Sequence, residues 1–168
     1  GSQKPTSKLR SLRAHGFRNN TDMEVEMNEN QIMYIVHGLE PIALVVRSGF
    51  DEPGIHFFTP PSFPQQVAYM RHPAGKQISA HIHNPVPRQV AYTQEVLFIR
   101  HGRVKVDLYS SNREYVTSSI LTTGDVILLC GGGHSFEMLE QTSMIEVKQG
   151  PYAGQDDKVS FYKETACN

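Results

Sequence analysis

Two histidines separated by a single residue are the first feature of this sequence that could do chemistry. His81 and His83 end a run, Gln77 to His83, that is typical of a β-strand. Side chains two positions apart on a strand point to the same face, so the two imidazoles would project together. Imidazole is the commonest metal ligand among the side chains. The pair is therefore a candidate for half of a metal site.

A glutamate and a third histidine farther along the chain could complete such a site. Glu95 lies near the start of the next expected strand, on the same face as Leu97 and Ile99, which are typical core residues. A carboxylate on an apolar face is costly unless it is paired or binds a metal. A glycine run at 131–133 then leads to His134, so a third imidazole follows a flexible turn. Together these residues would supply three nitrogens and one oxygen.

Short apolar and β-branched runs, separated by turn residues, predict the elements that position these side chains. Because proline lacks the donor that a ladder needs, the stretch Thr59 to Pro64 is expected to be a loop. Many short strands at close spacing indicate an all-β fold, an antiparallel sandwich or barrel. The expected strands are Gln31 to His37, Pro41 to Val46, Gln66 to Arg71, Gln77 to His83, Gln94 to Arg100, Arg103 to Tyr109, Glu114 to Leu121, Asp125 to Leu129, Ser135 to Glu140 and Ser143 to Lys148.

Length and composition favour one domain. The 168 residues, 39% of them hydrophobic, can bury a single core. Residues 1–22 are rich in Lys, Arg, Ser and Asn and are expected to form a flexible or docking arm, with the folded domain at 23–168. The 16 basic and 17 acidic residues nearly cancel, which argues against a nucleic-acid-binding surface.

Membrane insertion and disulfide formation are not expected. No stretch approaches the roughly 20 apolar residues of a membrane-spanning helix, and we expect a soluble cytoplasmic protein. Cys130 and Cys167 do not form a CxxC pair, so both are interpreted as free thiols in a reducing compartment. Cys130 ends an apolar run and is expected to be buried.

The joint spacing of the glycines, histidines and glutamate resembles the paired motifs of the cupin superfamily. The resemblance covers about half of the chain, roughly residues 70–148. It implies a jelly-roll barrel, an antiparallel double-stranded β-helix, in which the matching residues bind one divalent metal ion. The residues that carry it are Gly75-x5-His81-x-His83, Glu95-x6-Gly102, and Gly124 followed by His134. The whole chain also resembles small bacterial cupins associated with polysaccharide and nucleotide-sugar biosynthesis.

The sequence departs from the family pattern at both motifs. Eleven residues separate His83 from Glu95, where the family usually has three or four, and the glycine run at 131–133 replaces a usual proline-glycine pair. Arg88 and Tyr92 fall in or beside this insertion, which is expected at the barrel mouth, where loops often contact substrate. Arg88 could bind a carboxylate or phosphate of a substrate. A solvated loop is the alternative.

Three imidazoles and one carboxylate suit Fe(II), Mn, Ni, Cu or Zn. The resemblance favours Fe(II) and an oxygenase or dioxygenase acting on a small polar substrate, because many cupins with this ligand set are dioxygenases. A non-redox isomerase or epimerase acting on a sugar or sugar phosphate is the first alternative. A metal- or ligand-binding module without turnover is the second. A metal-free barrel whose histidines line an organic-ligand pocket would also fit.

Several other residues are given surface or assembly roles. Glu137 lies three residues after His134, so strand alternation turns it away from the metal side. His101, beside a turn glycine, is expected to be exposed, and Glu146 and Lys148 are interpreted as a possible ion pair along one strand face. A homodimer is expected through edge strands, with Gln31 to His37 and Pro41 to Val46 as the candidates.

Overall fold

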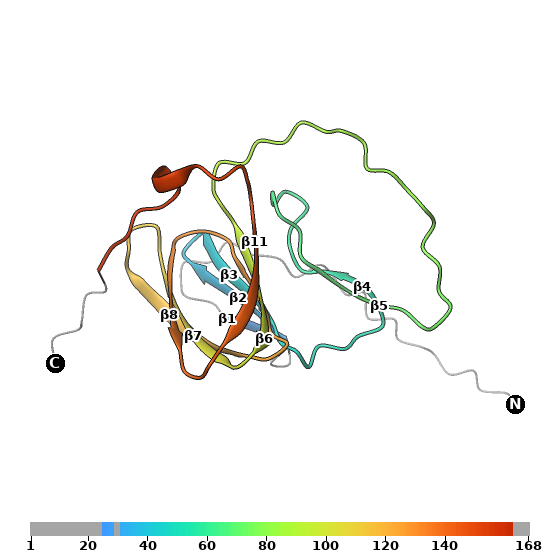
Figure 1. Cartoon of the computed structure of the whole chain (residues 1–168), viewed down its shortest axis with the longest axis horizontal. Coiled ribbons are helices and arrows are strands. Elements are labelled where there is room, and N and C mark those ends of the chain that lie inside the picture. Colours follow the sequence, from blue (N-terminus) through green and yellow to red (C-terminus); the bar gives the residue numbers. More distant parts are fainter. Residues whose placement is uncertain (1–24, 29–30, 163–168) are drawn as a thin grey trace, which may run out of the picture.

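The chain forms antiparallel β-sheets (Figure 1). The computed structural model describes residues 25–28 and 31–162, so the predicted arm at 1–22 lies outside the described residues. The elements are β1 (Val25–Asn28), β2 (Ile32–His37), β3 (Glu40–Val46), β4 (Gly54–Phe57), β5 (Ala68–Arg71), β6 (Glu95–His101), β7 (Arg103–Tyr109), β8 (Tyr115–Thr122), β9 (Val126–Leu129), β10 (Gly133–Met138), β11 (Ser143–Lys148) and the 3-10 turn Gly154–Asp157. No helix in this part of the chain is long and apolar enough to cross a bilayer.

Two sheets pack around the main core. One has six strands in the order β1-β2-β3-β9-β6-β11, and the other has three in the order β10-β7-β8. Alternate residues of β6 and β7 point into the space between them, which explains why Leu97, Val104 and Val106 are buried. This sandwich confirms the all-β prediction. Among the described residues the two sheets do not close into a barrel.

A second apolar cluster covers the outer face of the six-stranded sheet. Leu44 and Leu128 point away from the main core and pack with Phe58. Phe58 directly follows β4, in the segment that connects β4 to β5. Residues 42–46 are therefore buried on both faces, which explains their continuous apolar sequence. The predicted loop at 59–64 contains no strand, as expected.

The predicted strand at 77–83 is wrong for this structure. Residues 72–94 form a wide arc without regular structure, which Figure 1 shows in green beyond the β4–β5 hairpin. Residues 71–93 are all exposed. The period-two pattern indicates that a segment tends to be extended, whereas a strand also needs a partner strand. Among the described strands none pairs with this segment.

The candidate edge strands were also wrongly predicted. β2 lies between β1 and β3, and β3 lies between β2 and β9, so both ladders of each strand are occupied. In the described part of the six-stranded sheet the edges are instead β1 and β11. Glu137, by contrast, is placed as predicted: it pairs across the ladder with Lys105, on the face opposite His134.

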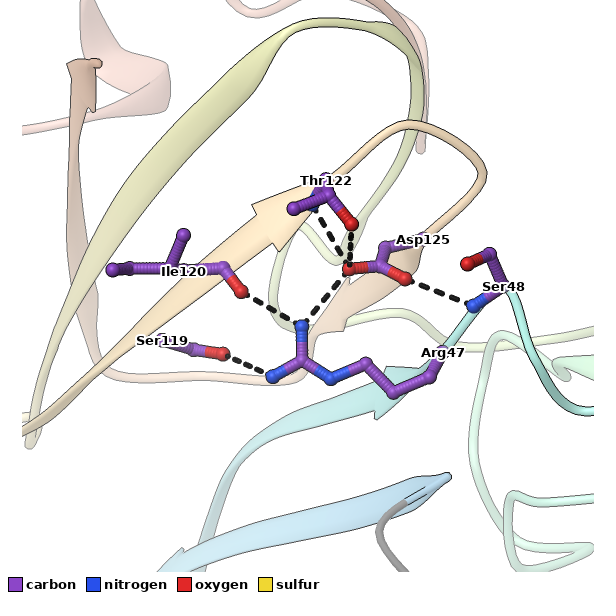
Figure 2. Close-up of polar contacts among 6 residues, drawn as sticks. All are labelled: Arg47, Ser48, Ser119, Ile120, Thr122 and Asp125. Atoms are coloured by element: carbon purple, nitrogen blue, oxygen red, sulfur yellow. Dashed lines mark hydrogen bonds and ion pairs between the residues drawn. The ribbon is translucent and has the colours of Figure 1, made fainter.

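A buried carboxylate joins the end of β3 to the turn between β8 and β9 (Figure 2). Asp125 is 2% exposed, and its Oδ2 accepts hydrogen bonds from Arg47 Nη1 at 2.9 Å and from the Thr122 amide at 2.9 Å. Its Oδ1 accepts from the Ser48 amide at 2.8 Å. Arg47 continues the network to the carbonyl of Ile120. One side chain therefore satisfies groups from both sheets.

Replacing this carboxylate should destabilise the whole fold. Asp125→Ala leaves the Arg47 guanidinium and two amides without their acceptor, and we expect a loss of about 3 kcal/mol in the free energy of unfolding. Urea denaturation measures it. Glu52→Gln, which changes an exposed carboxylate, is the control and should lie within about 0.5 kcal/mol of wild type. Equal stability of the two variants would contradict the proposed role of Asp125.

Candidate metal centre

Glu95 and His134 meet at the core side of the two sheets. The Oε2 of Glu95, at the start of β6, lies 3.3 Å from Nε2 of His134, at the start of β10. Their side chains are 17% and 31% exposed. His134 lies opposite the buried Leu108 in the β7–β10 ladder, so it faces inward. Glu95 also faces inward, because it shares its strand face with the buried Leu97. Two of the four predicted ligands are thus brought together by strands from different sheets.

Glycine conformation sets the position of His134. Gly132 has φ +65°, and a Cβ there would collide with the carbonyl oxygen of Tyr109. A Cβ on Gly133 would lie 2.8 Å from the ring of Phe161. Only glycine fits where the backbone passes so close to these groups. The two glycines therefore let the chain turn from β9 into β10, which pairs with β7. The glycine run is therefore needed for packing as well as for flexibility.

Lys148 is a neighbour of the site that sequence reasoning missed. It lies opposite Glu95 in the β6–β11 ladder, with its Nζ 3.9 Å from Oε1 of Glu95 and 3.8 Å from Oδ2 of Asp157. The interpretation of Lys148 as a partner of Glu146 does not hold, since its ion pairs run to these other two carboxylates. The register of β11 against β6 was the missing information.

The surroundings of Glu95 favour its charged form. The hydrogen bond with His134 is the largest influence and lowers the pKa of Glu95 below its ordinary value. Burial opposes this shift, while the positive charges of His134, Lys148 and Lys158 add to it. Glu95 is therefore ionised at neutral pH, as a metal ligand must be.

His81 and His83 lie apart from this pair. Both are exposed in the arc, with ring centroids 5.2 Å apart, and Nδ1 of His81 is 2.9 Å from the carbonyl oxygen of Ser79. Within residues 25–28 and 31–162 no group of three or more His, Cys, Asp or Glu side chains is arranged to hold a metal ion. The four predicted ligands thus form two separate pairs. Glu95 and His134 lie between the sheets, and His81 and His83 lie in the arc.

Arg88 and Tyr92 line a separate cavity of about 1110 Å³, which Glu95 and His134 do not line. Cys130 also borders this cavity and is buried, as predicted. Burial raises the pKa of its thiol to about 12, so the thiolate is not populated at neutral pH.

Comparisons of the chain with models of protein families, with curated proteins and with solved structures gave no match. The function proposed below is therefore based on the residues of the chain and on their geometry.

Removing His134 should raise the pKa of Glu95. His134→Ala removes the hydrogen bond and leaves burial in place, so the pKa should move upward from its depressed value. The associated stabilisation is present above the ordinary pKa of 4.5 and is lost as the pH falls through the lower folded value. Carboxyl-detected NMR titration measures the pKa, and His101→Ala, a change at an exposed histidine, is the control. An unchanged Glu95 pKa in His134→Ala would show that the pair does not interact.

Proposed function

We propose that this chain is a mononuclear metal-dependent enzyme of the cupin type that acts on a small polar molecule. One divalent transition metal ion would be bound by His81, His83, Glu95 and His134. The observation that carries the proposal is the half-buried contact between Glu95 and His134, 3.3 Å apart on the core side of the sheets. An ionised carboxylate beside an inward-facing imidazole is the donor arrangement that such a site needs.

The free edge of β10 gives the other two histidines a place to join this pair. β10 has β7 on one side and no neighbour on the other among the described strands. Phe136 and Met138 share the inward face of β10 with His134, yet they are 36% and 50% exposed. In the proposed metal-bound form, residues 77–83 pair with this edge as a fourth strand, and their inward side chains would pack beside Phe136 and Met138. His81 and His83 would then project inward beside His134, and the barrel would close as a jelly roll.

The donor set fits several metals. Three imidazoles and a carboxylate accept Fe(II), Mn, Ni, Cu or Zn, and Glu95 needs to lose no proton on binding. In the favoured form, an oxygenase, bound Fe(II) would supply the electrons for reaction with dioxygen. Glu95 and His134 would fix the ligand geometry, the apolar core beneath them would exclude water, and Lys148 would attract an anionic group of the substrate to the site.

A non-redox isomerase or epimerase is the second candidate, and the position of Lys148 favours it. Such a reaction needs an acid–base group near the metal. Lys148 Nζ lies 3.9 Å from Glu95, so one ionisable group is already in place. A sugar or sugar phosphate, with several oxygens to chelate a metal, would be a suitable substrate class.

Metal content is the first test of the proposed site. We expect about one equivalent of metal in the wild-type protein and strong loss in His83→Ala and His134→Ala, because each ligand contributes to affinity. His101→Ala should keep the metal. Elemental analysis measures the content, and oxygen uptake with candidate substrates then separates the two candidates: uptake with iron supports the oxygenase, and turnover without uptake supports the isomerase.

Two other results would change the proposal. Retention of metal without turnover across broad substrate panels would leave a binding module. Absence of metal after reconstitution with Fe(II), Mn(II) and Zn(II) would overturn the metal site.

Closure of residues 77–83 onto β10 should be visible by hydrogen exchange. Adding Zn(II), a redox-inert probe, should slow amide exchange in residues 77–83, because the new ladder protects their N–H groups. His134→Ala should show no such protection, and the turn at residues 110–113 provides an internal control. Stoichiometric zinc binding with unchanged exchange at 77–83 would contradict the closure.

A further inference from the structure

A cavity lies at the end of the sheets where several connecting segments meet. It is bounded by the β2–β3 turn, the proline-rich loop, the last part of the arc and the glycine run before β10. Its volume, about 1110 Å³, is comparable with the upper end of the roughly 300–1,000 Å³ found for small-molecule sites. The site proposed above does not depend on this cavity.

Gln94 brings a buried acceptor with no partner to this cavity. It is 5% exposed, its backbone amide donates to Oε1 of Gln149, and its Nε2 donates to the carbonyl of Cys130 at 3.1 Å. Its Oε1 has no hydrogen-bond partner among the described residues. The hydrogen bond from Nε2 fixes the amide group of this side chain, so the unpaired acceptor is held in a defined place. A ligand hydroxyl or amine would satisfy it.

Arg88 is a charged group of the cavity lining that suits an anion. Arg88 lines the cavity and makes no hydrogen bond or ion pair with any described residue. Glu40, the acidic residue in the lining, already accepts from the Ser111 amide at 3.1 Å and from its hydroxyl at 3.3 Å. The Glu40 carboxylate keeps its charge but already accepts from Ser111, whereas the Arg88 guanidinium has no partner among the described residues. A guanidinium binds carboxylate and phosphate groups through paired hydrogen bonds.

The walls are apolar and partly rigid. Phe63 and the prolines of the 59–64 loop form one side, and Tyr92 forms another. Gln66 holds this loop in shape, because its Nε2 donates to the carbonyls of Pro60 at 2.7 Å and Phe63 at 3.3 Å. Apolar walls with a few fixed polar groups are typical of sites for small organic molecules.

We propose that this cavity binds a small organic anion. A carboxylate or phosphate group would contact Arg88, a hydroxyl or amine donor would bind Oε1 of Gln94, and the apolar face of a ring would pack against Phe63. Gln94, which directly precedes β6, lines this cavity, whereas Glu95 and His134 do not, so this site is separate from the candidate metal centre.

Calorimetric titration of protein dialysed against EDTA tests the cavity without a contribution from metal. The probes are 4-hydroxybenzoate and glucose 1-phosphate, with the neutral 4-hydroxybenzamide and glucose as their matched controls. We expect at least one anion to bind and its neutral counterpart to bind about tenfold more weakly or not at all. The two anions show whether the site prefers a carboxylate or a phosphate.

Variants locate the binding. Arg88→Gln should weaken binding of the anion about tenfold, because the charged partner is lost. Arg100→Gln, which alters an exposed arginine on β6 outside the cavity, should have no effect. His134→Ala should also bind the anion normally. Loss of binding in His134→Ala would place the anion at the metal centre, and equal binding of charged and neutral probes, or no binding of either anion at millimolar concentration, would overturn the proposal.

Discussion

The arrangement of both sheets depends on the buried carboxylate of Asp125. Its side chain accepts from Arg47 and from the Ser48 amide, both just after β3, and from Thr122 at the end of β8. Its backbone carbonyl accepts from the Ile99 amide of β6 at 3.0 Å. One residue thus sets the relative positions of three strands. Because β9 begins directly after it and β10 follows β9, the separation of Glu95 and His134 also depends on this constraint.

Two neighbouring residues at the start of β6 contribute to two different sites. Glu95, the first residue of β6, contacts His134 between the sheets, whereas Gln94, which directly precedes the strand, borders the cavity. The carboxylate is kept charged by nearby positive groups, while the amide keeps one buried acceptor unsatisfied. The unsatisfied acceptor of Gln94 costs stability unless a ligand uses it, which is why it is interpreted as functional.

One edge of β10 has no partner among the described strands, and the exposed arc carries a segment with a strand-like sequence. An unpaired strand edge offers amides and carbonyls to any extended segment that can reach it. Phe136 and Met138 leave apolar surface open beside that edge, and residues 77–83 carry a strand-like pattern without a ladder. Pairing within one chain would satisfy both. A metal shared by histidines on the two segments would supply the free energy needed to order the arc.

Local sequence pattern determined most of the strands and the direction of their side chains. The strands Arg103–Tyr109 and Ser143–Lys148 have the predicted bounds, and Glu95 and Glu137 face the predicted sides. These properties follow from alternation along the chain, which is readable one residue at a time. Ladder partners are different, since register joins residues far apart in sequence. Only the tertiary structure could therefore place Lys148 beside Glu95 and Arg47 beside Asp125. It also decided that β2 and β3 are interior strands and that residues 77–83 pair with none of the described strands, because each of these outcomes depends on contacts between distant residues.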